Sequence, residues 1–232
     1  MTDKISTGND KLDEFLGGGY DTDIITTVYG PSGSGKTNIV MLAMISAAKS
    51  GKKVIYMDTE GGFSIERMQQ MADNYKELLD HVIFLRPTNF EEQMEAFEKL
   101  KKIAPLKIGL VIVDTISMLY RLKLGKNQEV YEVNRELGRQ LSNLVEMARK
   151  HNIPVLLANQ VYSNFDERDK VNMVGGDILN YASKCLIELQ ITPDGKRRAI
   201  LKKHRFLSQE KDFIFEIVNE GIRPSKESFK LF

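Results

Sequence analysis

Five short apolar runs set the strongest limit on how this chain can fold. Each is four to six residues long and rich in Val, Ile or Leu; they occupy residues 24–29, 54–58, 82–85, 110–114 and 155–159. Runs of this kind are typical of strands that are buried on both faces, as in a parallel sheet. The sequence therefore predicts a parallel sheet covered on both sides.

Amphipathic stretches lie between these runs. Residues 90–104 and 130–151 carry apolar side chains at steps of three or four, with charged residues between them. Because strands alternate with helices, we expect right-handed crossovers and a doubly wound α/β sheet. Such sheets bind ligands at the carboxyl ends of their strands, which is where the motifs described below are expected.

The pattern changes after about residue 184. The strand-like segments 185–191 and 197–203 flank four turn residues, Thr192, Pro193, Asp194 and Gly195. This arrangement predicts an antiparallel hairpin, and residues 213–218 predict a further strand. The mostly parallel sheet should therefore continue into an antiparallel C-terminal extension.

Length and composition favour one domain spanning residues 1–232. The chain is 42% apolar and 28% charged, with a formal net charge of +1, which is ordinary for a globular protein. No run of about 18 apolar residues and no signal peptide is visible, so we expect neither a membrane segment nor export. Cys185 is the single cysteine, which excludes an intramolecular disulfide and makes the cytoplasm the expected location.

A glycine-rich motif follows the first apolar run. It fits G-x-x-x-x-G-K-[ST] and opens a helical stretch at residues 38–50, so it has the strand before it and the helix after it that a phosphate-binding loop requires. Glycines let backbone N–H groups approach phosphate oxygens, and the helix amino terminus adds positive potential. The residues expected to bind the nucleotide are Gly30, Pro31, Ser32, Gly33, Ser34, Gly35, Lys36 and Thr37.

Three side chains supply the charge and the metal ligands that hydrolysis of ATP needs. Lys36 is expected to contact the β and γ phosphates, and the Thr37 hydroxyl is placed to bind Mg²⁺. Asp114 ends the run 110–114 and is the candidate for the second protein ligand of Mg²⁺. A helix cap is the alternative role for an acid at this position.

Hydrolysis also needs a group that orients the attacking water. Glu60 lies just past the second apolar run and can serve as the general base. Asp58, two residues earlier, is the rival candidate, and the sequence alone leaves both open.

In their order along the chain, these and other residues resemble the RecA/RadA recombinase family, and within it the short archaeal RadB branch. The resemblance covers nearly the whole length and implies a RecA-type P-loop ATPase core. Each pair of matches is weak, but the ordered set is specific. The set is Ile5-Ser6-Thr7-Gly8, Leu12-Asp13, Gly17-Gly18-Gly19, the phosphate loop, Asp58-Thr59-Glu60-Gly61, Glu66-Arg67, Asp114, Leu119-Tyr120-Arg121, Asn159-Gln160-Val161 and Gly175-Gly176.

The resemblance also implies roles for three residues near the nucleotide. Glu60 would activate water, Arg67 would lie against the adenine, and Gln160 would sense the γ phosphate and relay its presence to the following loop. The chemistry of Gln160 agrees, because a neutral amide at the end of a buried strand can contact phosphate without adding charge. A surface glutamine without such a role is the alternative.

Two loops, residues 121–129 and 162–174, would face DNA in such proteins. Basic groups bind phosphates, and aromatic rings can stack on bases. The second loop also holds Asp166, Glu167 and Asp169, so a solvated charged loop is its alternative. The DNA-binding candidates in these loops are Arg121, Lys123, Lys126, Tyr162, Phe165, Arg168 and Lys170.

The strongest basic stretch lies in the predicted hairpin, and its DNA-binding candidates are Lys202, Lys203 and Arg205. No acid interrupts residues 196–205. In RecA-like assemblies the corresponding region reaches the nucleotide of the neighbouring subunit, so Lys203 or Arg205 could act in trans. The alternative is an exposed hairpin face.

The resembling pattern starts within the first ten residues, which leaves no room for a helix-hairpin-helix domain or for the linker whose aromatic residue joins subunits of a recombinase filament. Self-assembly should therefore be weakened, and the resemblance implies a slow ATPase with an accessory or regulatory role. Its implied partners are single-stranded or branched DNA, a Holliday-junction resolvase and other recombination proteins. Two alternatives are a KaiC-like ATPase or signalling module and a nucleotide-gated adaptor, both without a DNA function.

Overall fold

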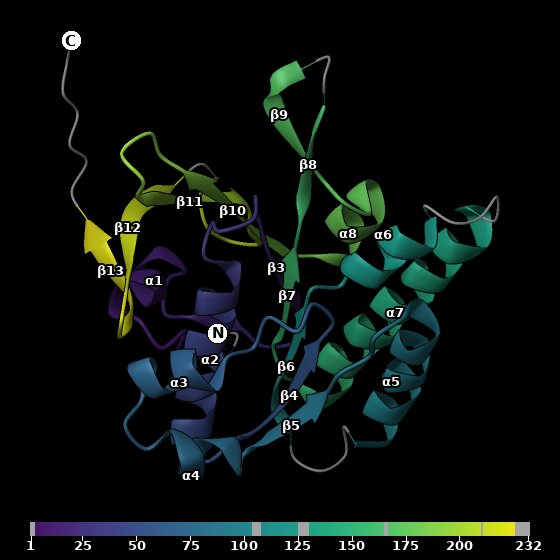
Figure 1. Cartoon of the computed structure of the whole chain (residues 1–232), viewed down its shortest axis with the longest axis horizontal. Coiled ribbons are helices and arrows are strands. Elements are labelled where there is room, and N and C mark those ends of the chain that lie inside the picture. Colours follow the sequence, from purple (N-terminus) through teal and green to yellow (C-terminus); the bar gives the residue numbers. More distant parts are fainter. Residues whose placement is uncertain (1–2, 104–107, 125–129, 165–166, 210, 226–232) are drawn as a thin grey trace.

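The computed structural model describes residues 3–103, 108–124, 130–164, 167–209 and 211–225. Its centre is a nine-stranded sheet in the order β13-β12-β11-β10-β3-β7-β6-β4-β5 (Figure 1). The strands are β3 (Ile25–Tyr29), β4 (Lys53–Asp58), β5 (Val82–Leu85), β6 (Ile108–Asp114), β7 (Val155–Asn159), β10 (Cys185–Ile191), β11 (Arg197–Lys203), β12 (Asp212–Val218) and β13 (Gly221–Ser225). The expected α/β fold is confirmed.

The sheet changes character at β10. From β10 through β3, β7, β6 and β4 to β5, neighbouring strands pair in parallel. On the other side, β11, β12 and β13 pair antiparallel. The sequence did not predict β13, because its Pro224 argues against a strand; an edge strand tolerates proline, since the missing N–H faces no partner.

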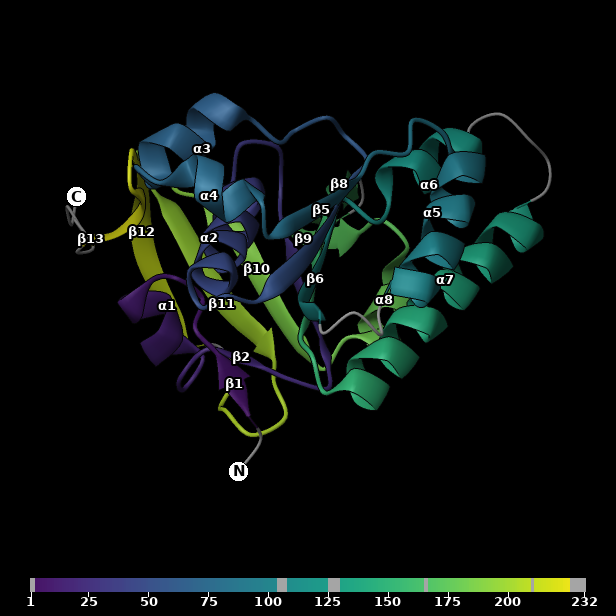
Figure 2. The same ribbon diagram turned by 90° about the horizontal axis from the view of Figure 1, so that it is seen from below.

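Helices cover both faces of the sheet (Figure 2). The hydrophobic core is accordingly divided into two clusters, one on each face. The helices of the first face are α1 (Asp10–Phe15), α2 (Lys36–Lys49), α3 (Ile65–Met71) and α4 (Tyr75–Leu79). Those of the second face are α5 (Phe90–Ile103), α6 (Met118–Leu124), α7 (Val130–His151) and α8 (Gly176–Ala182).

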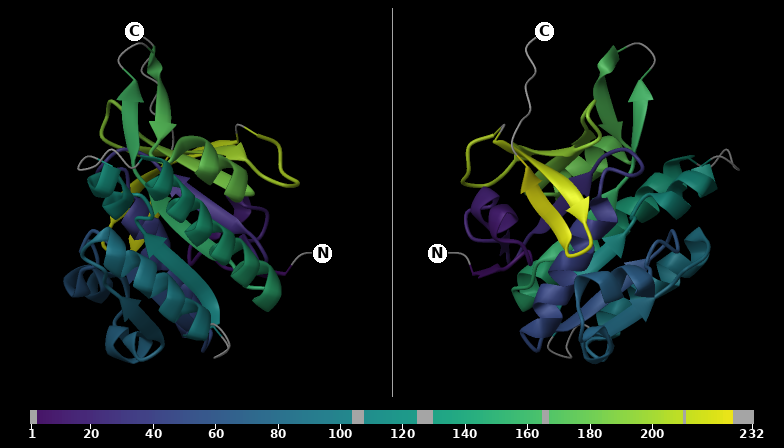
Figure 3. Two further views of the ribbon diagram at one scale, coloured as in Figure 1. Left: turned by 90° about the vertical axis from the view of Figure 1, so that its right-hand side faces the viewer. Right: turned by 60° about the vertical axis from the view of Figure 1, so that its left-hand side comes forward.

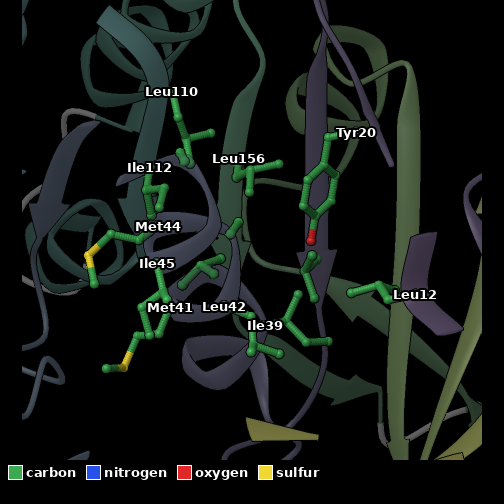
Figure 4. Close-up of a cluster of buried hydrophobic side chains, with 14 of the residues drawn as sticks. Leu12, Tyr20, Ile39, Met41, Leu42, Met44, Ile45, Leu110, Ile112 and Leu156 are labelled. Atoms are coloured by element: carbon green, nitrogen blue, oxygen red, sulfur yellow. The ribbon is translucent and has the colours of Figure 1, made fainter. Parts of the chain in front are cut away.

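Helix α2 lies at the centre of the first cluster (Figure 4). Its apolar residues point in nearly all directions because α2 contacts β6 and β7 on the sheet, β13 at the edge and α4 on its outer side. Ile39 and Met44 are fully buried and share this cluster with Ile112 and Leu156 from the sheet. Burial of this kind contributes about 25 cal/mol per Å² of apolar surface, so the helix that follows the phosphate loop is firmly held.

A two-stranded ribbon corrects the expectation of a loop at residues 162–174. Strands β8 (Val161–Asn164) and β9 (Glu167–Met173) pair antiparallel and project from the carboxyl edge of the sheet (Figures 1 and 3). Their largely polar and charged sequence hides the strands, since it lacks the continuous apolar run that marks the strands of the central sheet. A second small ribbon, β1 (Lys4–Ile5) with β2 (Tyr20–Asp21), lies beside α1.

The first expected DNA loop, residues 121–129, is also corrected. Its beginning is helical, because α6 extends through Leu124 and buries Leu119 and Tyr120 against the second face. Residues 125–129 lie outside the described part of the chain. Among the described residues, no helix is both long enough and apolar enough to cross a bilayer.

Candidate active site

The strand register brings the predicted site residues to one edge of the sheet. Asp58 ends β4 and pairs in register with Asp114, which ends β6. Asp114 is in turn level with Ala158 of β7, and the phosphate loop starts immediately after β3 at the same edge. The carboxyl ends of the parallel strands thus lie together, and so do the candidate site residues that end or follow them.

The phosphate loop is shaped by its glycines. A Cβ at Gly30 would lie 2.4 Å from the carbonyl oxygen of Leu189 on β10, so only glycine fits there. Gly35, at the amino end of α2, has φ of 100°, a left-handed conformation that side chains disfavour. The start of the loop therefore packs closely against β10, and α2 begins directly after the loop.

Lys36 is folded back onto this loop. Its Nζ donates to the carbonyl oxygens of Gly30 and Pro31, both at 2.9 Å. Burial lowers the pKa of Lys36, while the nearby carboxylates of Glu60 and Asp114 act in the opposite direction. A buried cation surrounded by loop carbonyls is a group that a phosphate can readily draw to itself.

Asp114 has the surroundings of a metal ligand. Its Oδ2 accepts hydrogen bonds from the Thr37 hydroxyl and from the Tyr56 hydroxyl, each at 2.9 Å. Burial raises the pKa of Asp114 to about 6, against the opposing effect of these two donors. A hydroxyl and a carboxylate side by side next to a phosphate loop fit Mg²⁺, which usually takes one or two protein ligands and completes its shell with phosphates and water.

Glu60 is joined to two other groups at this edge. Its Oε1 accepts a 2.8 Å hydrogen bond from the Thr115 hydroxyl and a 2.6 Å hydrogen bond from Nε2 of Gln160. Glu60 and Gln160, separated by 100 residues in the sequence, thus lie side by side. Gln160 lies directly before β8, so this contact also reaches the base of the projecting ribbon.

Asp58, the rival for the general base, is engaged differently. Its Oδ1 accepts from the backbone N–H groups of Glu60 and Gly62, at 3.3 and 3.1 Å, and its Oδ2 accepts from that of Phe63 at 3.1 Å. The carboxylate therefore orders the loop that carries Glu60. This geometry favours Glu60 as the base and gives Asp58 a supporting role.

Arg67 lies at the amino end of α3 and holds the C-terminal extension. Its guanidinium donates to Oδ1 of Asn38 at 2.7 Å and to the carbonyl oxygens of Val218 and Asn219 at 2.7 and 3.1 Å. These bonds use the edge of the guanidinium and fix its plane. Stacking on adenine, which uses the flat face, remains a prediction.

The sequence analysis missed two polar residues of the site. Thr115 follows Asp114 directly, and its hydroxyl contacts Glu60 as described above. Tyr56 lies two residues before Asp58, on the same strand and the same side of it, and its fully buried hydroxyl contacts Asp114. The period of two along a strand is the signal that could have suggested Tyr56.

The DNA-binding candidates near the ribbon are only partly described. Arg121 is exposed on α6, whereas Lys123 on the same helix forms an ion pair with Glu91. Tyr162 on β8 is 49% exposed. Burial and, to a smaller extent, the nearby Tyr162 raise the pKa of Tyr120 on α6. Lys126 and Phe165 lie outside the described residues, and Arg168 and Lys170 are described in their backbone alone, on β9.

The basic stretch at residues 196–205 is divided by the structure. Arg197 faces Ile191 across the hairpin, at the phosphate-loop end of the sheet, whereas Lys203 faces Leu186 at the opposite end. Lys202 belongs to that second end. Lys203 Nζ donates to the carbonyl oxygen of Asn180 at 2.6 Å, and Arg205 forms a bidentate ion pair with Asp23. The expected single basic patch is therefore two separate groups.

Comparison with known proteins agrees with this geometry. The family model described as Rad51 matches residues 2–225. The chain is 42% identical over 220 residues to the DNA repair and recombination protein RadB of Methanococcus maripaludis, a match that covers 94% of this chain and 100% of that protein. It is 39% identical over 219 residues to the protein of that name from Methanosphaera stadtmanae, covering 92% and 93%. A crystal structure of the RadB recombinase superposes with a TM-score of 0.81 at 38% identity, covering 96% of this chain and all of that one.

Proposed function

The chain belongs to the Rad51 family, and we propose that it acts there as an ATP- and DNA-binding accessory protein that hydrolyses ATP slowly. Its role in DNA repair and recombination follows from the family and from the RadB relatives. We further propose that residues 1–232 work as one RecA-like ATPase domain.

Nucleotide binding is supported by the state of the phosphate loop. The amino end of α2 and the Lys36 ammonium both favour a polyphosphate, and Lys36 would exchange its bonds to Gly30 and Pro31 for bonds to phosphate. Thr37 and Asp114 would hold Mg²⁺, which would neutralise charge on the phosphates when bound. ATP and Mg²⁺ are thus the proposed substrate and cofactor.

The observation that carries the proposal is the contact between Glu60 and Gln160. A carboxylate near the phosphates can take a proton from the attacking water, and removing such a base usually costs a factor of 10² to 10⁴ in rate. Gln160 at the ribbon base can exchange its bond to Glu60 for one to the γ phosphate. The same residue pair would thereby couple nucleotide occupancy to the position of the ribbon.

Slow turnover is supported by the contacts of Lys203 and Arg205. Both are held within their own chain, by Asn180 and by Asp23, rather than standing free to reach a neighbour's nucleotide. A side chain that must first break a bidentate ion pair makes a poor trans contact. We therefore propose a regulatory role.

We also propose that the protein acts in the cytoplasm and binds single-stranded or branched DNA. Its proposed protein partners are a Holliday-junction resolvase and other recombination proteins.

The proposal is tested by fluorescence anisotropy of labelled single-stranded DNA, titrated with the protein at several salt concentrations. Each titration is made with and without a non-hydrolysable ATP analogue, and Lys36→Ala serves as the variant that should not respond to the analogue. We expect binding that weakens with salt, because phosphate contacts release counterions, and that changes with the analogue.

Absence of binding to either single-stranded or branched DNA at low salt would contradict the DNA-binding part of the proposal. If the analogue still bound under those conditions, the nucleotide-gated adaptor would become the better description. The experiment would then turn to protein partners.

A further inference from the structure

Arg197 lies against the phosphate loop although it comes from the far hairpin. It is the first residue of β11, 164 residues after Gly33, and its Nε and Nη2 both donate to the carbonyl oxygen of Gly33, at 3.3 and 3.1 Å. Its third nitrogen, Nη1, donates to the carbonyl oxygen of Gly195 in the hairpin turn. The guanidinium is therefore fixed to its own hairpin while it grips the loop.

The gripped oxygen belongs to a bend of the loop. The backbone N–H of Ser34 donates to the carbonyl oxygen of Pro31 at 3.2 Å, which closes a turn over residues 31–34. Gly33, inside this turn, has φ of 74°, and a Cβ placed on it would meet nothing within 4 Å. The tip of the bend, at Ser32 and Gly33, is thus exposed, whereas Ser34 behind it is buried.

Two side chains of the described residues bond to carbonyl oxygens of this bend. Lys36 bonds to Pro31, and Arg197 bonds to Gly33. When Lys36 turns to the phosphates of a nucleotide, its bond to Pro31 is lost. Arg197 is then the side chain that still fixes the bend, at the moment when the loop must keep its N–H groups directed at the ligand.

We propose that Arg197 is a positioning residue for nucleotide binding, which clamps the phosphate loop from outside through the Gly33 carbonyl. The inference rests on the proposed nucleotide-binding function and deepens it. A loop with several glycines loses much backbone entropy when it is ordered, and a fixed external clamp lowers this cost before the ligand arrives. Arg197 touches neither the base Glu60 nor the metal ligands, so its effect belongs to binding rather than to the chemical step.

Arg198, the next residue, offers a matched control. It carries the same charge on the same strand, but its Nε bonds to Oδ2 of Asp212 at 2.6 Å, away from the loop. An effect of general positive charge on the hairpin would be shared by both arginines. If Arg197 acts as a clamp, only its replacement should weaken nucleotide binding.

The test measures equilibrium binding of fluorescent mant-ADP with Mg²⁺, and KM and kcat for ATP, in the wild type, Arg197→Ala, Arg197→Lys and Arg198→Ala. We expect Arg197→Ala to weaken mant-ADP binding about tenfold, the size of effect typical of a hydrogen bond to a charged group. KM should rise by a similar factor while kcat stays within about twofold, because uniform binding is lost. Lysine should restore part of the affinity, since it keeps the charge but not the two-pronged contact.

Three results would overturn the inference: unchanged binding in Arg197→Ala, an equal loss in Arg198→Ala, or a loss confined to kcat. Thermal unfolding of each variant without nucleotide shows whether it is folded. Failure of the proposed function is visible separately, because the wild type itself would then bind no mant-ADP, and the inference would fall with it. If the wild type and Arg197→Ala bound mant-ADP equally well, the proposed clamp would be ruled out while the proposed nucleotide binding would stand.

Discussion

Nε2 of Gln160 donates a 2.6 Å hydrogen bond to Oε1 of Glu60, across 100 residues of sequence. The bond joins the candidate base to the first residue after β7, where the chain leaves the sheet for the ribbon. Thr115 holds the same carboxylate oxygen from the strand end that carries Asp114. One carboxylate oxygen of Glu60 therefore links the residue that follows β6 to the residue that follows β7.

Replacing the base should separate hydrolysis from binding. We expect Glu60→Gln to lower kcat for ATP by at least about 100-fold, because the amide cannot take a proton from water. Binding of mant-ADP should stay within about threefold of the wild type. The assay is steady-state phosphate release, with Glu95→Gln, the same change at an exposed glutamate of α5, as the control. Retained turnover in Glu60→Gln would return Asp58 to consideration as the base.

Removing the side-chain amide of Gln160 should make DNA affinity less dependent on bound nucleotide. In Gln160→Ala we expect the difference between DNA affinities measured with and without an ATP analogue to fall to less than about a third of its wild-type value, because the bond that links Glu60 to the ribbon base is gone. Fluorescence anisotropy of labelled DNA measures both affinities. Gln69→Ala, an exposed glutamine on α3, should keep the full response. A full response in Gln160→Ala would show that coupling takes another route.

The raised pKa of Asp114 predicts a pH dependence of stability. In the folded protein the pKa is about 6, against an ordinary value of 3.8 for an aspartate, so between about pH 4 and pH 6 the folded state holds a proton that the unfolded chain has released. The contribution of Asp114 to the free energy of unfolding of the nucleotide-free protein should therefore fall as pH rises through this window, by at most about 3 kcal/mol. Above pH 6 this contribution stays lost.

Asp114→Asn should remove this penalty, since an amide does not ionise. We expect its melting temperature without nucleotide to exceed that of the wild type at pH 7.5 and to approach it at pH 5, while stabilisation by Mg²⁺ and ADP disappears. Scanning calorimetry measures both effects, and Asp73→Asn, at an exposed position, is the control. An equal gain at both pH values would assign the effect to packing instead of ionisation.

Two exposed aromatic rings distinguish the two candidate DNA surfaces. Tyr162 is 49% exposed at the ribbon, and Phe206 is 70% exposed beside Arg205 at the opposite end of the sheet. We expect Tyr162→Ala to weaken single-stranded DNA binding by about fivefold or more, the lower range for loss of one stacked base, and Phe206→Ala to have little effect. The reverse result would move the interface to the end that carries Lys203 and Arg205.

The sequence predicts the buried strands and the phosphate loop well because each has a strong local signal. Val155–Asn159 is apolar throughout its first four residues, and the loop has a fixed spacing of glycines before Lys36. The ribbon β8–β9 lacks such a signal, since its strands pair with each other away from the core. Pro224 likewise hides β13.

The features that the sequence could not predict depend on contacts between residues that are distant along the chain. The sequence leaves both Glu60 and Asp58 open as the base, and their contacts separate them: three backbone N–H groups bond to Asp58, whereas Thr115 and Gln160 bond to Glu60. The basic stretch is continuous in sequence, yet the direction of β11 carries Arg197 to one end of the sheet and Arg205 toward the other. Neither distinction can be drawn before the tertiary structure is known.

The last strand pair also sets the order in which this protein can become functional as it leaves the ribosome. Asn9 donates to the carbonyl oxygen of Ile222 at 3.0 Å, and Arg67 bonds to that of Val218. The cap of the first helix and Arg67 thus both find these partners only after a long further stretch of the chain has been translated. A nascent chain halted before Val218 would carry a complete phosphate motif in its sequence but an unfinished pocket around it, and premature nucleotide capture on the ribosome would be disfavoured.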